Sequence, residues 1–452
     1  MSKSKRKIVI IGNGISGITC ARNIRKKDAE ADVLVISGES THFFSRTALM
    51  YIYMGHMKYE HTKPYEDWFW EKNRIKLKKL WVEIVDFEQK KIFCSNGKGI
   101  RFDVLIFATG SRPNKFGWPG QDLMGVQGLY SKQDLELMEQ NTLDVKHAVV
   151  VGGGLIGIEM AEMLASRKIP VTFLVREKNF WDNVLPLDEA QMINRHILEH
   201  HIDLRLETEL EQIIGNEEGR VRAVKTKSGE VIDCQFVGLT VGVSPNIKFL
   251  KETPLETNIG IVVDEYFRTN FPGMYAIGDC AEFKQAPAAD RRKIEQVWYT
   301  GRMHGETLAH NLTSENPVPY RPGIWFNSAK FFDIEYQTYG QVPPNFSEEI
   351  ESFYWEHEGG KVCLRIVYSK VDQKILGVNA FGWRLRHEFF DKAINESWTL
   401  EKVLSKLDQA NFNPEFYKPY HRAVLDHYQQ LTGKEIRVQK VSFLKRLIGS
   451  RS

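Results

Sequence analysis

Two glycine-rich segments with the same spacing occur in this chain, the first near the N-terminus and the second 140 residues later. Their glycines are Gly12, Gly14 and Gly17 in GNGISG, and Gly152, Gly154 and Gly157 in GGGLIG. In a GxGxxG sequence the first glycine permits a tight turn and the second lets backbone N–H groups approach a pyrophosphate, while the third allows close packing of helix and strand. The sequence therefore predicts two phosphate-binding turns, each suited to a dinucleotide.

Both glycine segments follow a short apolar run and precede a helical pattern. The runs at 8–11 and 149–151 are rich in β-branched residues, as is typical of buried parallel strands. The N-terminus of a helix that begins at such a turn attracts phosphate. Because strand, turn and helix occur together, the signal is much more specific than the glycine spacing alone, and we predict two Rossmann-like units.

Three further segments place polar or small residues at the ends of predicted strands. These residues are Glu39, the run Ala108, Thr109 and Gly110, and the pair Gly278 and Asp279. Small residues let the backbone approach a ligand. A carboxylate at the end of a parallel strand accepts hydrogen bonds from sugar hydroxyls, which is the role predicted for Glu39 and Asp279. The alternative for Glu39 is a solvated loop acid, and the alternative for Asp279 is a helix N-cap, which is compatible with the sugar-binding role.

The strand that ends at Gly278 also bears on domain organisation. It predicts that the first unit resumes after the second unit has ended. We therefore expect an α/β fold with two Rossmann-like dinucleotide-binding domains, one inserted in the other, plus a C-terminal α+β domain. The predicted ranges are 1–118 with 245–318 for the first domain, 119–244 for the second and 319–452 for the third.

Composition argues against several classes of function. The 61 basic and 58 acidic residues leave a net charge of +3, so nothing global indicates a nucleic-acid ligand. No apolar run approaches the roughly 20 residues of a membrane span, and no signal peptide precedes the first strand, which predicts a cytoplasmic protein.

The five cysteines are scattered without CxxC or metal-binding spacing. We expect them to pack in the core, and we expect no metal site.

In this order, GxGxxG, ATG, GGGxIGxE and a terminal GD resemble the two-dinucleotide-binding flavoprotein reductases, over about 7–340. Within them the chain is most similar to the ferredoxin-reductase, rubredoxin-reductase and nitrite-reductase flavin-subunit branch. The resemblance implies a FAD-dependent oxidoreductase of the pyridine nucleotide-disulfide oxidoreductase family. FAD is expected at the first turn and NADH or NADPH at the second, with hydride passing from the nicotinamide to flavin N5.

Two positions that hold cysteine in other branches of these reductases hold no cysteine in this chain, which separates it from those branches. No CxxxxC follows the first glycine segment, so a disulfide mechanism is not expected. Arg46 occupies the place of the single cysteine of the NADH oxidase and peroxidase branch, and we include it among the predicted cofactor-binding residues. Without a redox thiol, the electrons must pass to a separate acceptor. A small redox protein is the first candidate for this acceptor, and a quinone is the second.

Three residues are predicted to act beside the flavin. Glu159 belongs to GGGxIGxE, but the lysine that commonly pairs with this glutamate in the similar branch is replaced by Tyr51. We expect a buried Glu159 to have a raised pKa and to hold a proton near the flavin, the alternative being a partly solvated helix residue. Trp298 follows the segment 295–297 and is predicted to lie beside the isoalloxazine ring, the alternative being a core position.

Arg176 and Glu177 follow the second predicted strand of the inserted unit, where nucleotide selection is expected. A carboxylate there favours the free 2′-hydroxyl of NADH, whereas an arginine favours the 2′-phosphate of NADPH. Gly157, rather than alanine, at the last glycine position resembles the NADH pattern. The sequence leaves both nucleotides open, and it also leaves open a surface ion pair between Arg176 and a neighbouring acid.

The C-terminal segment 434–452 combines positive charge with apolar residues. Its cationic residues are Lys434, Arg437, Lys440, Lys445, Arg446 and Arg451, against the single acid Glu435. Such a basic amphipathic helix suits an anionic membrane surface, a site on its own protein or a partner, with disorder as the other alternative. Two alternative functions therefore stay open: a peripheral membrane NAD(P)H:quinone reductase at the inner face of a membrane, and a nicotinamide-sensing interaction protein similar to apoptosis-inducing factor. Formation of an oligomer is also left open.

Overall fold

The computed structural model describes residues 5–412, 416 and 418–436. The chain divides into two compact units: unit 1 comprises Met1–Glu177 and Ile202–Pro322, and unit 2 comprises Lys178–His201 and Gly323–Ser452. Each unit has its own sheets and its own hydrophobic core. Both glycine-rich segments belong to unit 1, whereas most of unit 2 comes from the C-terminal third of the chain.

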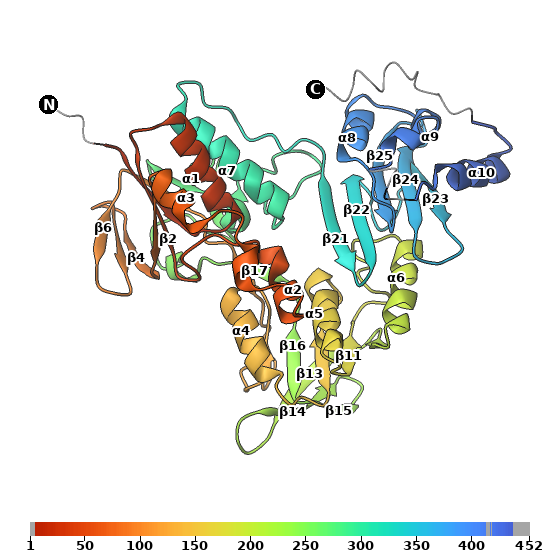
Figure 1. Ribbon diagram of the computed structural model, residues 1–452, viewed down its shortest axis with the longest axis horizontal. Helices are drawn as coiled ribbons and strands as arrows, with labels where there is room; N and C mark the ends of the chain where they lie inside the picture. Colours follow the sequence, from red (N-terminus) through yellow and green to blue (C-terminus); the bar gives the residue numbers. More distant parts are fainter. Residues whose placement is uncertain (1–4, 413–415, 417, 437–452) are drawn as a thin grey trace. The chain divides into compact units, whose positions relative to one another are not determined.

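The first glycine segment follows the central strand of a five-stranded parallel sheet with the order β19-β7-β1-β2-β3. The strands are β1 (Lys7–Ile11), β2 (Asp32–Ser37), β3 (Ile75–Lys79), β7 (Val104–Phe107) and β19 (Met274–Ala276). All but the first residue of β1 are buried, which explains its continuous apolar sequence. Helices α1 (Ile15–Lys27) and α7 (Trp298–Thr313) pack side by side (Figure 1). Because β19 follows the second glycine segment in the chain, this sheet is built from two separate parts of the sequence.

The second glycine segment belongs to another five-stranded parallel sheet, with the order β12-β11-β10-β16-β9. The strands are β9 (Val126–Gln127), β10 (Ala148–Val151), β11 (Val171–Leu174), β12 (Asp203–Arg205) and β16 (Phe236–Leu239). Helix α5 (Leu155–Ser166) begins directly after Gly154 and packs against β10 and β11. A parallel sheet with a helix that begins at a glycine turn therefore occurs twice, and the predicted Rossmann-like fold class is confirmed.

Shorter elements complete unit 1. Its small sheets contain β4 (Val82–Asp86), β5 (Lys91–Cys94) and β6 (Gly99–Arg101); β13 (Leu210–Gly215), β14 (Val221–Thr226) and β15 (Val231–Asp233); β8 (Ser111–Pro113) and β17 (Val243–Pro245); and β18 (Ile261–Val263) and β20 (Ala281–Phe283). Its other helices are α2 (Leu49–Tyr53), α3 (Asp67–Lys72) and α4 (Lys132–Asn141), and its 3-10 helices are η1 (Arg46–Ala48), η2 (Tyr59–Thr62), η3 (Lys248–Leu250) and η4 (Gly278–Cys280). Because β8 and β17 pair, the two chain connections between the parallel sheets run side by side.

Unit 2 is built on a five-stranded antiparallel sheet with the order β21-β22-β25-β24-β23. The strands are β21 (Phe326–Phe331), β22 (Ile334–Gly340), β23 (Ile350–Glu356), β24 (Cys363–Ser369) and β25 (Ile375–Phe381). The helical elements are α6 (Leu187–Glu199), α8 (His387–Asn395), α9 (Leu400–Leu404), η5 (Leu407–Ala410) and α10 (His421–Thr432). Most of the aromatic residues of this region are buried in the unit and form part of its core.

The segment 178–201 packs with this C-terminal sheet, although it falls within the range expected for the second dinucleotide-binding domain. On α6, Glu189 Oε1 accepts a hydrogen bond of 2.7 Å from Arg365 Nε of β24, and both side chains are buried. Trp181 packs edge-on against Phe331, with their ring centroids 5.9 Å apart. These contacts join residues that are far apart in the sequence, so no local pattern indicates them.

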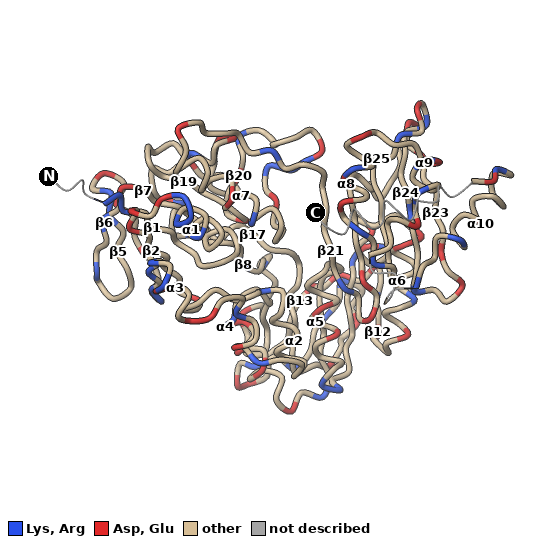
Figure 2. Tube along the Cα trace, turned by 45° about the horizontal axis from the view of Figure 1, so that its top comes forward, with Lys and Arg blue, Asp and Glu red and all other residues tan. Residues whose placement is uncertain are grey.

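Charged residues of both signs are interspersed along the chain trace (Figure 2), in keeping with the nearly balanced composition. In the described part of the chain, no helix is both long enough and apolar enough to cross a membrane. The predicted basic helix over 434–452 lies outside the described residues from 437 onwards. Of its first residues, Lys434 forms an ion pair of 2.9 Å with Glu401 at the start of α9.

Candidate functional site

The first glycine turn has a geometry that only glycine allows at two of its positions. Gly12 has a φ of +114°, and a Cβ there would collide with the carbonyl oxygen of Ala108. A Cβ on Gly17 would collide with the carbonyl oxygen of Gly12. At Gly14, by contrast, a Cβ would meet no protein atom within 4 Å. The missing side chain at Gly14 therefore leaves open space at the N-terminus of α1, where a phosphate is favoured.

The second glycine turn repeats this arrangement. Gly152 has a φ of +115°, and a Cβ there would lie 2.6 Å from the carbonyl oxygen of Thr240. A Cβ on Gly157 would collide with the carbonyl oxygen of Gly152, whereas one on Gly154 would meet no protein atom within 4 Å. Both turns therefore have two glycines required by the protein's own packing and one that faces open space.

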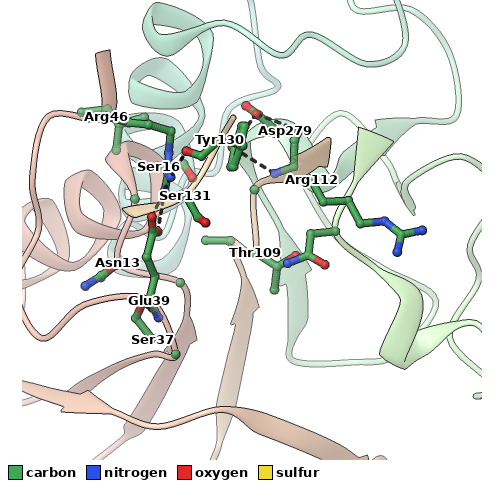
Figure 3. Close-up of a pocket in the computed structure, with 18 of the residues that line it drawn as sticks. Asn13, Ser16, Ser37, Glu39, Arg46, Thr109, Arg112, Tyr130, Ser131 and Asp279 are labelled. Carbon is green, nitrogen blue, oxygen red and sulfur yellow. Dashed lines mark hydrogen bonds and ion pairs between the residues drawn. The ribbon is translucent and has the colours of Figure 1, made fainter. Parts of the chain in front are cut away.

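A cavity of about 970 Å³ adjoins the first turn (Figure 3). This volume lies at the upper end of the range for small-molecule and cofactor sites. The sequence-predicted residues that line it are Gly12, Gly14, Glu39, Arg46, Ala108, Thr109, Gly110, Glu159, Asp279 and Trp298. The fold thus brings to one cavity most of the residues predicted around the first turn, although they come from widely separated parts of the chain.

Glu39 and Arg46 form a two-point ion pair on the cavity wall (Figure 3). Arg46 Nη1 and Nη2 donate to the two Glu39 carboxylate oxygens over 2.7 and 2.6 Å. The guanidinium group also donates to the Tyr130 carbonyl oxygen and lies over the Tyr130 ring, while the Lys132 N–H donates to Glu39. Burial opposes the charged form of Arg46, but the ion pair with Glu39 outweighs it and raises the pKa of Arg46. The Glu39 carboxylate is therefore held in one orientation.

Asp279 accepts two hydrogen bonds inside unit 1. Its Oδ2 accepts from Ser111 Oγ over 2.9 Å and from the Tyr130 hydroxyl over 3.1 Å. Burial raises the pKa of Asp279, and these two hydrogen bonds oppose that shift. The N-cap of the short helix η4 is Ile277 rather than Asp279, so the N-cap alternative is wrong. Ser111 and Tyr130 were not among the predicted site residues, although Ser111 directly follows the small-residue segment.

A buried histidine supports the loop that carries Asp279. The Gly278 N–H donates to His304 Nδ1 over 3.1 Å, and His304 of α7 is 1% exposed. Burial, with a smaller contribution from the Arg291 charge, lowers the pKa of His304 to about 3. The ring is therefore neutral at physiological pH and accepts through Nδ1. His304 was also missed from the sequence, where an isolated histidine within a helix gives no distinctive signal.

The three residues predicted to act beside the flavin differ in their positions. Glu159 on α5 and Trp298 at the start of α7 both line the cavity and are half-buried. The half-buried position of Glu159 agrees with the alternative of a partly solvated helix residue, because its part of α5 faces the cavity. Tyr51 lies on α2, outside the set of lining residues, with its ring stacked near His56.

Arg176 and Glu177 lie just beyond β11 and form an ion pair with each other. Arg176 Nε donates to Glu177 Oε1 over 2.8 Å. The Arg176 side chain is 75% exposed, whereas that of Glu177 is 26% exposed. The pairing of Arg176 with a neighbouring acid is thus present, and neither residue lines the cavity at the first turn.

All five cysteines are buried and unpaired, as predicted. They are Cys20, Cys94, Cys234, Cys280 and Cys363. Burial raises the pKa of each thiol, which makes a reactive thiolate unfavourable. None of the five lines the cavity, so the described cavity wall carries no thiol group.

The chain is similar in sequence and in fold to several known proteins. A family model described as pyridine nucleotide-disulphide oxidoreductase matches residues 6–305. The nitrite reductase [NAD(P)H] of Bacillus subtilis (strain 168) is 27% identical over 84% of this chain and 46% of its own, so this chain spans about half of that relative. The rubredoxin-NAD(+) reductase of Pseudomonas putida is 25% identical over 70% of this chain and 83% of its own. The solved structure of a NAD-dependent persulfide reductase from A. fulgidus has the same fold, with a TM-score of 0.80, 22% identity and coverage of 96% of this chain and 86% of its own.

Proposed function

This chain belongs to the pyridine nucleotide-disulphide oxidoreductase family, and from that premise we propose that it is a FAD-dependent NAD(P)H oxidoreductase that passes electrons to a small redox protein. The observation that carries the proposal is the pair of glycine turns with open space at Gly14 and Gly154. The first of these adjoins a cavity large enough for a cofactor, which suits a resident dinucleotide. The helix α5 that begins at the second turn contributes Glu159 to the same cavity, which suits a second dinucleotide that reaches the first.

The residues around the first turn fit FAD. The N-terminus of α1 and the space at Gly14 suit its pyrophosphate, and the fixed Glu39 carboxylate suits its ribose hydroxyls. Asp279 would accept hydrogen bonds from sugar hydroxyls of the cofactor, while Trp298 would pack against its ring system. FAD, when bound, supplies a ring that accepts a hydride. We propose that Glu159, which lines the same cavity, holds a proton near the flavin. We propose that Tyr51 on α2 assists Glu159 in this role.

The residues around the second turn suit NADH or NADPH. Gly154 leaves room for a pyrophosphate at the N-terminus of α5. Glu177 is less exposed than Arg176 and lies at the end of β11, where a carboxylate accepts from the 2′-hydroxyl of NADH. We propose NADH as the preferred donor, with Arg176 free to turn from its exposed position towards a 2′-phosphate.

A separate electron acceptor is supported by the positions of the five cysteines, which are buried and do not line the described cavity wall. The relatives include a reductase whose name specifies rubredoxin, a small electron carrier. We propose the domain division 1–118 with 245–318 for FAD, 119–244 for NAD(P)H and 319–452 for the C-terminal domain, with the segment 178–201 of the second range packed against the C-terminal sheet. The second candidate, a peripheral membrane quinone reductase, is favoured only by the basic composition of 434–452.

Two matched variants test the central assignment. Gly14→Val places a Cβ where no protein atom lies within 4 Å, so the protein should fold but lose its flavin, with no flavin absorbance after gel filtration. Gly154→Val should keep the flavin but require at least about tenfold more NADH for its anaerobic bleaching. Stoichiometric flavin in Gly14→Val, or unchanged bleaching in Gly154→Val, would contradict the assignment.

The acceptor is identified by adding candidate acceptors to the NADH-bleached wild-type protein. Fast reoxidation by rubredoxin or ferredoxin that weakens with salt supports a redox-protein reductase, because transient redox partners associate largely through charge. Fast reoxidation by a quinone alone supports the second candidate. Slow reoxidation by every acceptor would instead indicate a nicotinamide-sensing interaction protein.

A further inference from the structure

Unit 2 contains a cluster of two histidines and one aspartate that the dinucleotide sites do not use. His196 and His200 lie four residues apart on α6 and its C-terminal end, so they project from one face of the helix. Asp333 occupies the tight turn between β21 and β22, next to Phe332, whose φ is +54°. All three residues belong to unit 2 and lie outside the lining of the cavity at the first turn.

The possible ligand atoms of the three side chains converge. His196 Nε2 lies 2.7 Å and His200 Nε2 lies 3.3 Å from the same oxygen of Asp333, Oδ1. All three ligand atoms lie within 4.8 Å of one another. Two ligand atoms that are each about 2.0–2.2 Å from a tetrahedral Zn²⁺ are roughly 3.3 Å apart. A small rotation of the Asp333 carboxyl group away from His196 therefore gives the spacing of a metal site.

The buried ring of His196 lacks the hydrogen bonds that a buried imidazole normally forms. The His196 side chain is 1% exposed, and neither of its ring nitrogens has a hydrogen-bond partner among the described residues. Asp333 Oδ1 is close to Nε2 but does not meet the geometry of a hydrogen bond. Because buried polar groups are normally satisfied, a buried Nε2 that faces Asp333 without forming a hydrogen bond points to an ion that both groups could share once the carboxyl group turns away.

Neighbouring side chains orient the three possible ligands. Glu199 Oε2 lies 3.5 Å from His196 Nδ1, the ring nitrogen that does not face Asp333. Lys361 Nζ donates to Asp333 Oδ2 over 3.0 Å, which leaves Oδ1 directed at the imidazoles. The Phe332 ring stacks on His200, with centroids 4.1 Å apart and an interplanar angle of 6°. Metal-ligating histidines and carboxylates are commonly held by outer partners of this kind.

We propose that His196, His200 and Asp333 bind a divalent transition-metal ion such as Zn²⁺. Two imidazoles and one carboxylate suit Zn²⁺, and three protein ligands leave a fourth position for water. The partly exposed side chains of His200 and Asp333 provide a path to solvent. The bound ion would fasten α6 to the turn between β21 and β22. The expectation of no metal site rested on cysteine spacing and did not weigh the pair in HILEH.

The site can be tested on the untagged, flavin-loaded full chain with Co²⁺ as a spectroscopic probe and Zn²⁺ as a competitor. One Co²⁺ per chain should bind with the visible absorption of a four-coordinate ion, and Zn²⁺ should displace it. His200→Ala and Asp333→Asn should each weaken binding by at least about tenfold. His201→Ala removes the adjacent, exposed histidine and should bind as the wild type does.

The variants are chosen so that folding and metal binding can be separated. His200 and Asp333 are partly exposed, and retention of flavin absorbance and of circular dichroism verifies that each variant folds. The wild-type melting temperature should rise with added Zn²⁺, and that of Asp333→Asn should not. No stoichiometric Co²⁺ binding, or equal binding by wild type, His200→Ala and Asp333→Asn, would show that the cluster is a His–Asp ion pair only and would overturn the proposal.

Discussion

The buried His304 should make the protein sensitive to mild acid. Its pKa is about 3 in the folded protein, against 6.5 for an ordinary histidine. Between these values the unfolded chain binds a proton that the folded protein does not, so stability falls as the pH falls from about 6.5 towards 3. Above about pH 6.5 both states are neutral at this residue, and its effect on stability disappears.

The size of the effect follows from the shift in pKa. Each pKa unit of difference between the folded and unfolded states corresponds to about 1.4 kcal/mol. Between pH 7 and pH 5, protonation of this histidine in the unfolded chain should lower the free energy of unfolding by about 2 kcal/mol. His304→Asn keeps a side-chain acceptor for the Gly278 N–H but removes the titrating ring. The variant should therefore lose about 2 kcal/mol less than the wild type over this pH range.

Urea unfolding at pH 7 and pH 5, followed by tryptophan fluorescence, measures this difference. The comparison is the change in unfolding free energy between the two pH values, so groups that titrate in both proteins cancel. His310→Asn, a change at a less buried histidine of the same helix, controls for the loss of an imidazole. Equal acid sensitivity of wild type and His304→Asn would refute the reasoning.

Three further substitutions have definite expected outcomes. Arg46→Ala removes both hydrogen bonds to Glu39 and should weaken FAD binding by about 1.5–3 kcal/mol. Titration of the apoprotein with FAD should then give a dissociation constant roughly 10- to 150-fold higher. Unchanged affinity would contradict the role of the ion pair. Arg365→Ala leaves Glu189 buried without its cation and should lower the free energy of unfolding by about 3–5 kcal/mol in urea, much more than Arg365→Met combined with Glu189→Leu. Glu177→Ala should lower the ratio of kcat/KM for NADH over NADPH by about tenfold, and a constant ratio would exclude it from nucleotide selection.

The sequence by itself identifies the elements whose signals are local. The glycine turns are of this kind, because the backbone at Gly12 and Gly152 is accessible mainly to glycine whatever surrounds it. The buried parallel strands are also visible, since strands covered on both faces need continuous apolar runs. Positions directly after such strands, such as Glu39 and Asp279, follow from the rule that ligands bind at the carboxyl ends of parallel strands.

The tertiary structure alone decides which of these positions meet. Asp279 accepts from Ser111, 168 residues away, and from Tyr130, 149 residues away, contacts that no local pattern contains. In the same way α6 packs with the C-terminal sheet through the buried pair of Glu189 and Arg365. Backbone geometry and burial periodicity act within a few residues and can be seen in the sequence. Hydrogen bonds, ion pairs and burial between distant segments depend on how the whole chain packs, and so does the pKa of a group such as His304.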